Sequence, residues 1–192
     1  YPGLHYSFEG KQADMADSIG SLKLSFVFSV LAIYAMLAIP FKSYILPLIV
    51  IVSIPFGIIG AIFGHIIMGF NLSILSMLGI IALSGIVVND SLVLISQAVH
   101  LEKTTDLEPK EIIKAAGIQR FRPIILTTLT TFFGLAPMIV ETSRQARMLI
   151  PMAVSIGFGI LFATLITLVL IPSLYLVIND CKRCWKSLFA QL

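Results

Sequence analysis

An aspartate in the middle of an apolar run is the residue of this sequence with the clearest chemical potential. Asp90 follows Asn89 inside residues 72–99. About 20 residues rising ~1.5 Å each span the ~30 Å hydrocarbon core of a bilayer, so this run is long enough to cross a membrane. A charged side chain is costly at that depth, and such residues usually face a protein interior or a water-filled cavity on an ion or proton pathway. We therefore expect Asn89 and Asp90 to take part in proton binding.

A later apolar run, residues 123–141, is rich in hydroxyl groups: Thr127, Thr128, Thr130 and Thr131. Counted from the middle of each run, Asp90 and Thr127 both lie ~7 Å toward the same membrane face if the two helices are antiparallel neighbours. Arg120 precedes this run and can extend inward while its charge stays near water. The sequence thus predicts that Asn89, Asp90, Thr127 and Arg120 form a path of exchangeable protons.

Two simpler interpretations of these residues stay open. Threonines in membrane helices often bond only their own backbone carbonyls. Asp90 can equally be a structural hydrogen-bonding residue, or be solvated by an aqueous vestibule. Neither interpretation requires proton transport.

The composition places the chain among membrane proteins. The 192 residues are 58% hydrophobic and only 12% charged, whereas about a quarter of the residues of soluble domains are charged. Five apolar runs are each long enough to span a bilayer, namely residues 22–41, 44–70, 72–99, 123–141 and 149–178. We expect an all-α membrane protein, a bundle of five transmembrane helices. A polar lead-in precedes it (1–21), a loop with a short amphipathic helix divides it (100–122), and a polar tail follows it (179–192).

The lysines and arginines predict which side of the membrane each end occupies. With the N-terminus outside, the inner segments hold nine of the 13 basic residues: Lys42, Lys103, Lys110, Lys114, Arg120, Arg122, Lys182, Arg183 and Lys186. The outer segments hold four: Lys11, Lys23, Arg144 and Arg147. The excess of positive charge favours a cytoplasmic C-terminus. Because the basic residues lie in short loops, the net charge of +3 does not indicate nucleic-acid binding.

Small residues in the second run predict close helix packing. Glycines recur there at Gly57, Gly60 and Gly64, and we assign the same role to Gly85 in the third run. Small residues four apart let membrane helices approach closely. Pro47 and Pro55 should kink the second helix.

Catalysis and metal binding are weakly supported. Ser84 lies in Ala82-Leu83-Ser84-Gly85, which resembles the Gly-x-Ser-Gly of rhomboid intramembrane proteases, with His65 as the conceivable base. The first glycine is absent, however, and His65 lies near the outer end of its run whereas Ser84 is mid-membrane. Cys181 and Cys184 form a C-x-x-C, but two thiolates do not complete a four-ligand zinc site. We expect no enzyme activity, metal or cofactor.

Several separated motifs resemble those of the resistance-nodulation-division (RND) exporters. They are Ala38-Ile39-Pro40-Phe41-Lys42-Ser43-Tyr44, Ile54-Pro55-Phe56-Gly57 with Gly60, Gly85-Ile86-Val87-Val88-Asn89, and Arg120-Phe121-Arg122-Pro123-Ile124 leading to Thr127-Thr128. Their order and spacing are similar to the hydrophobe/amphiphile drug-efflux branch over nearly the whole chain.

This resemblance implies the last five helices of a twelve-helix bacterial inner-membrane protein, with the N-terminus in the periplasm. It implies a proton-driven multidrug antiporter that is a homotrimer. Such a trimer works together with a periplasmic adaptor and an outer-membrane channel. The N-terminal half of the same transporter is then a partner of this chain, and the chain is a fragment. A structural helix bundle with no activity of its own is the alternative for the isolated 192 residues.

The resemblance also implies roles for individual residues. Arg120 and Thr127 match the relay arginine and threonine of the family. Asn89 stands where the best-known drug exporters have a lysine, which is a departure from the pattern. Asp90 matches neither of the relay aspartates, which belong to the other half of the transporter, so its role is inferred from its burial alone.

Overall fold

Helices account for almost all of the residues that the structure describes. The computed structural model describes residues 11–143 and 146–189, with side-chain surroundings for residues 17–143 and 146–181. The elements are α1 (Lys11–Phe41), α2 (Ile45–Ile51), α3 (Ile54–Met68), α4 (Ile74–Thr104), α5 (Pro109–Val140), the 3-10 helix η1 (Ala146–Met148) and α6 (Ile150–Phe189). Within these described residues, five helical segments have the length and composition to cross a membrane. The expected all-α membrane fold is confirmed.

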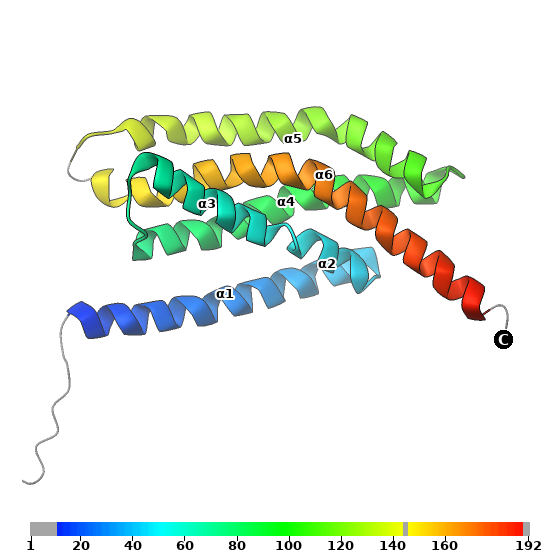
Figure 1. Cartoon of the computed structure of the whole chain (residues 1–192), viewed down its shortest axis with the longest axis horizontal. Coiled ribbons are helices and arrows are strands. Elements are labelled where there is room, and N and C mark those ends of the chain that lie inside the picture. Colours follow the sequence, from blue (N-terminus) through cyan, green and yellow to red (C-terminus); the bar gives the residue numbers. More distant parts are fainter. Residues whose placement is uncertain (1–10, 144–145, 190–192) are drawn as a thin grey trace, which may run out of the picture.

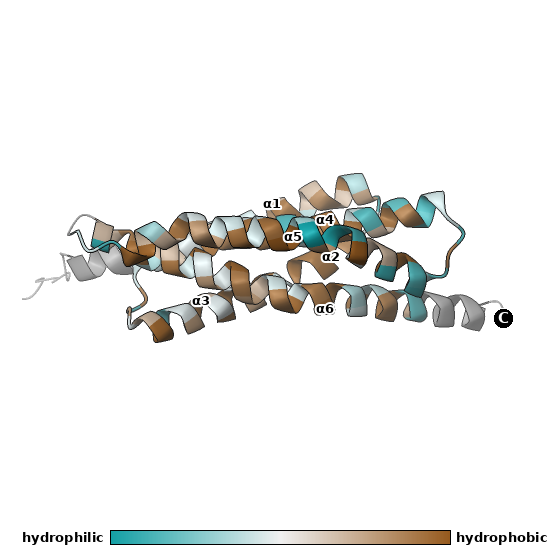
Figure 2. Cartoon of the chain, turned by 90° about the horizontal axis from the view of Figure 1, so that it is seen from above, coloured by the Kyte–Doolittle hydropathy of each residue, from teal (hydrophilic) through white to brown (hydrophobic). Residues whose placement is uncertain are grey.

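Helix α6 is the centre of the bundle. It packs most extensively against α3, α4 and α5, whereas α1 makes smaller contacts with α2 and α4. Figure 1 shows α6 running between α3 and α5, and α1 set apart along one side. Because the connections between spans are short, successive spans run in opposite directions. In Figure 2 the hydrophilic residues are concentrated toward the end of the bundle where α4 passes into α5.

The second span is broken rather than simply kinked. Helix α2 ends at Ile51 and α3 begins at Ile54, directly before Pro55. Proline has no N–H to donate to the preceding turn, so the continuous helical ladder is interrupted at this point. Ser53, fully buried in the break, donates a hydrogen bond to the carbonyl of Val50. The sequence predicted a kink at Pro47 and Pro55, whereas the structure divides the span into two helices next to Pro55.

The turn between the second and third spans follows from local sequence. Gly69 ends α3 with φ of 69°, a left-handed conformation that favours glycine. Ser73 then caps α4, because its hydroxyl accepts from the N–H of Ser76 at 3.2 Å while its own N–H donates to Ser76 Oγ at 3.1 Å. This reciprocal capping satisfies backbone donors that a helix start leaves free.

The segment between the third and fourth spans differs from the expected short separate helix. Residues from Pro109 onward are helical, but they run without interruption through Pro123 into the fourth span as α5. Pro123 lies on an exposed part of the helix, where the loss of one N–H and a local adjustment are tolerated. The amphipathic stretch is thus the first part of a 32-residue helix.

Glycines create the closest contacts between α3 and α6. A Cβ placed on Gly60 would lie 2.5 Å from Cβ of Phe162, and one placed on Gly64 would collide with Phe158. Gly57 faces Leu83 and Val87 of α4. Gly85 differs from these three, because a Cβ there would meet nothing within 4 Å. It makes no close helix contact within the described part of the chain.

Candidate functional site

Asp90 points into the bundle. It lies near the middle of α4 and is only 7% exposed. Its carboxyl group interacts with the hydroxyls of Thr127 and Thr128 on α5. The predicted meeting of Asp90 with the threonine-rich segment is therefore present, and Thr128, which is 3% exposed, is the more buried of the two partners.

The two threonines satisfy the carboxyl group incompletely. Thr127 Oγ1 and Thr128 Oγ1 both donate to the carbonyl oxygen of Ile124, at 2.8 and 2.9 Å. Oδ2 of Asp90 is buried and has no hydrogen-bond partner among the residues that the structure describes. An ionised carboxylate with an orphaned buried oxygen is unfavourable in low dielectric. This geometry suits a carboxyl group that gains a proton.

Asn89 does not join this buried cluster. Its side chain is exposed, since successive residues of an α-helix are rotated by about 100°. It makes no side-chain hydrogen bond within the described residues. Thr127 is exposed as well, although its hydroxyl reaches Asp90. The site thus lies at the border between the core of the bundle and its outer surface.

Arg120 is positioned two helical turns away from the carboxyl group. Its Nη2 donates to Oε1 of Gln97 at 2.6 Å, and Nε2 of Gln97 donates to Oε1 of Gln119 at 2.7 Å. Gln97 is seven residues beyond Asp90 on α4, or ~10 Å along the axis. In the described part of the chain no salt bridge reaches Asp90. The structure therefore brings together Asp90 and Thr127 of the predicted path, but not Asn89 or Arg120.

Sequence reasoning missed the hydroxyl groups of Ser53, Ser91 and Thr164 beside this site. Ser91 donates to Ser53 Oγ at 3.0 Å, which ties α4 to the break between α2 and α3. Thr128 and Thr164 place their hydroxyl oxygens 2.8 Å apart, which ties α5 to α6. All of these residues are buried. In the sequence, each of these residues is visible only as a polar residue within an apolar run. Serine and threonine are too common in such runs for this to mark particular residues as functional.

The protease-like arrangement is not formed. Ser84 Oγ donates to its own helix at the carbonyl of Ile81, at 2.6 Å. His65 instead contacts Ser76 Oγ through Nε2 at 2.8 Å, and Ser76 lies eight residues before Ser84, or ~12 Å along α4. His65, the base considered for this arrangement, is thus not a partner of Ser84. At the other motif, Cys181 is an exposed free thiol, and the side chain of Cys184 lies outside the described residues.

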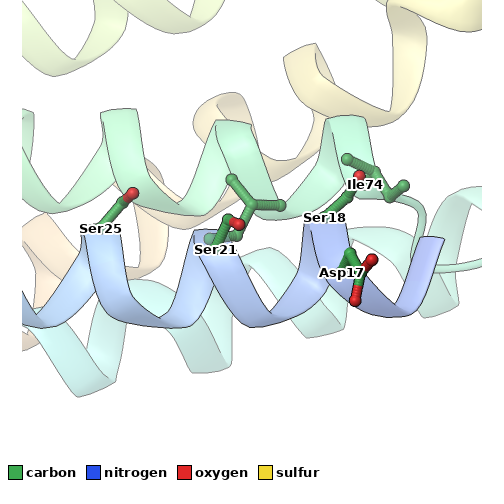
Figure 3. Close-up of a pocket in the computed structure, with 6 residues that line it drawn as sticks. Asp17, Ser18, Ser21, Ser25 and Ile74 are labelled. Atoms are coloured by element: carbon green, nitrogen blue, oxygen red, sulfur yellow. The ribbon is translucent and has the colours of Figure 1, made fainter. Parts of the chain in front are cut away.

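A groove separates α1 from the start of α4. Asp17, Ser18, Ser21, Ser25 and Ile74 border its polar end, which encloses about 520 Å³ (Figure 3). A second hollow beside α1 has apolar walls that include Phe26, Ile58, Met77 and Ile80. Among the described residues that line the two hollows, Asp17 and Lys23 are charged and both are exposed, so the carboxyl site on α4 is the stronger functional candidate.

Comparison with known proteins identifies the family. A model of the AcrB/AcrD/AcrF family matches residues 1–179. The fold is similar to the crystal structure of a heavy metal efflux pump, with a TM-score of 0.80 and 23% identity over 93% of this chain. This chain spans 18% of the length of that pump chain. With the helices, their order and the motifs in agreement, the chain belongs to the AcrB/AcrD/AcrF family of RND transporters.

Proposed function

We propose that this chain is the C-terminal transmembrane part of a proton-driven RND efflux pump and that Asp90 binds the transported proton. One observation carries the proposal: a carboxyl group in the membrane core has two hydroxyls at its side and a buried oxygen without a partner among the described residues. Such a group gains a hydrogen-bond donor when it is protonated. Its two protonation states therefore favour different arrangements of the helices around it.

The membrane potential supplies the energy for such a rearrangement. Moving one elementary charge across the membrane is worth ~2.3 kcal/mol per 100 mV. One or two protons per cycle therefore suffice to shift the packing of helices by several kcal/mol. Asp90 is well placed for this, because its neighbours belong to α5 and, through Thr128, to α6. Helix α6 contacts every other span except α1 extensively.

The resemblance of the motifs described above supports a proposal for the substrate class and the assembly. We assign the pump to the hydrophobe/amphiphile branch, which makes it a multidrug antiporter. We place it in the bacterial inner membrane with its N-terminus in the periplasm and its C-terminus in the cytoplasm, in line with the distribution of basic residues. Its partners are then the N-terminal half of the transporter, two further copies in a trimer, a periplasmic adaptor and an outer-membrane channel. The chain acts as a transporter and not as an enzyme.

The test uses the complete transporter in proteoliposomes with an imposed proton gradient. Ethidium serves as the amphiphilic probe, Zn²⁺ as the metal probe, and a pH-sensitive dye reports proton movement. In Asp90→Asn we expect proton-coupled transport to fall by about tenfold or more, since an amide cannot carry the coupled proton. Asp106→Asn, which alters an exposed acid in the loop between α4 and α5, is the matched control.

Each outcome bears on a separate part of the proposal. Unchanged coupled transport in a correctly inserted Asp90→Asn protein would disprove the proton-binding role. Transport of Zn²⁺ without transport of ethidium would disprove the amphiphile branch and leave the proton site intact.

A further inference from the structure

A hydroxyl pair connects the carboxyl site to the central helix of the bundle. Thr128 Oγ1 on α5 lies 2.8 Å from Thr164 Oγ1 on α6. The two residues are 3% and 2% exposed, so no bulk water competes for their protons. Thr128 also interacts with Asp90 on α4. Three helices thus meet through one chain of polar atoms.

Thr164 differs from the other threonines of these helices. Thr127, Thr130, Thr131 and Thr167 each donate to a carbonyl of their own helix. That is the usual behaviour of threonine inside a membrane helix. The hydroxyl of Thr164 has only Thr128 Oγ1 as a partner among the described residues. Its interaction is therefore between helices and not local.

The number of protons that each hydroxyl can donate determines the donor-to-acceptor direction of these hydrogen bonds. A hydroxyl group has one proton to donate and two lone pairs to accept. Thr164 has a single acceptor within reach, the hydroxyl oxygen of Thr128, so its proton is satisfied only by donation to Thr128. Thr128 then has a choice of two acceptors, the carbonyl of Ile124 at 2.9 Å and the carboxyl group of Asp90. A hydroxyl that accepts a hydrogen bond becomes a better donor, because such chains polarise cooperatively.

We propose that Thr164 is a positioning residue of the proton site, which orients the hydroxyl of Thr128 toward Asp90 and links the protonation of Asp90 to α6. With Asp90 ionised, Thr128 donates to the carboxylate. With Asp90 protonated, the carboxyl O–H donates to Thr128 Oγ1, and the Thr128 hydroxyl donates to the carbonyl of Ile124. No covalent bond is made or broken at either threonine. This inference rests on the proposed proton-binding role of Asp90.

The experiment compares three substitutions on α6 in the complete transporter. Thr164→Val removes the hydroxyl at nearly constant shape, and Thr164→Ser retains it. Thr167→Val is the matched control, since Thr167 is also buried but bonds only the carbonyl of Thr164. Proton-coupled ethidium transport is measured in proteoliposomes. Infrared spectroscopy follows the C=O stretching band of the protonated Asp90 carboxyl, identified by its loss in Asp90→Asn.

We expect Thr164→Val to lower coupled transport by about fivefold, the effect of losing one hydrogen bond, and to shift the carboxyl band to higher frequency. Thr164→Ser and Thr167→Val should behave as the unmodified protein does. If Thr164→Val does not insert, Thr164→Ala, which also lacks the hydroxyl, replaces it. Equal behaviour of Thr164→Val and Thr167→Val in both measurements would overturn the inference. Equal impairment of Thr164→Ser and Thr164→Val would also overturn it, by assigning the effect to packing.

Failure of this inference is distinguishable from failure of the proposed function. If Asp90→Asn abolishes coupled transport and Thr164→Val does not alter it, the proton site stands without a role for Thr164. If Asp90→Asn transports normally, the proposed function fails. The carboxyl band of Asp90 in Thr164→Val then still reports whether the hydroxyl chain reaches the carboxyl group.

Discussion

Nε2 of His65 lies 2.8 Å from Oγ of Ser76, which ties the end of α3 to the first turn of α4. Nδ1 of His65 faces the carbonyl oxygen of Ala61 at 2.9 Å. A carbonyl only accepts, so Nδ1 carries a proton and, in the neutral ring, Nε2 accepts from the Ser76 hydroxyl. The tautomer of His65 is thus set by its own helix. Ser76 also caps α4 together with Ser73.

Replacing His65 should loosen this end of the bundle. His65 and Ser76 are 3% and 0% exposed. His65→Ala therefore leaves the Ser76 hydroxyl buried without this partner, which costs about 1–3 kcal/mol. We expect a lower midpoint of thermal unfolding for the complete transporter in detergent. His100→Ala, at an exposed position of α4, should leave the midpoint unchanged; an equal loss in both variants would refute the proposed link.

Replacing glycines by alanine should show which glycines are needed for close helix packing and which only lower the helix propensity. Gly60→Ala and Gly64→Ala place a methyl group against Phe162 and Phe158, and overpacking of this kind costs about 1–3 kcal/mol. Gly85→Ala meets nothing within 4 Å and should be neutral or stabilise α4 by up to ~1 kcal/mol. Thermal unfolding of the complete transporter measures both effects. Destabilisation by Gly85→Ala equal to that of Gly60→Ala would contradict this packing.

A double-mutant cycle should locate the partner of Arg120. Its guanidinium group donates to Gln97 and not to Asp90. For Arg120→Gln and Gln97→Ala we expect a coupling of about 1.5–3 kcal/mol, which is typical of a hydrogen bond to a charged group. For Arg120→Gln and Asp90→Asn we expect the changes in the free energy of unfolding to be additive in the double mutant. Strong coupling in the second pair, without any in the first, would show that Arg120 is paired with the carboxyl group.

Much of the architecture could be predicted from the linear chain. A run of apolar residues long enough to span the bilayer forms a helix, because every backbone group must find its partner within the segment. Interruptions of the helices could be expected at residues with unusual backbone properties. Pro55, which lacks an N–H, and Gly69, which adopts a left-handed conformation, are such residues. The continuity of α5 through Pro123 was not foreseen. Whether a proline divides a helix depends on what its neighbours can satisfy, and this is a tertiary property.

The identity of the chemical groups at the site was visible in the sequence, but their arrangement was not. Asp90 stood out because an acid in hydrocarbon is costly, and the threonine-rich run was expected to lie at its level. The rotation of each helix about its own axis decided the rest. It turned Asp90 inward and Asn89 outward, and it paired Arg120 with Gln97 and Thr128 with Thr164. Helices that are apolar on every side carry no hydropathy signal for this rotation. Close packing of small residues contributes to it, as where Gly79 of α4 meets Met152 and Ser155 of α6, because close backbone approach rather than the exclusion of water drives helix association in a membrane.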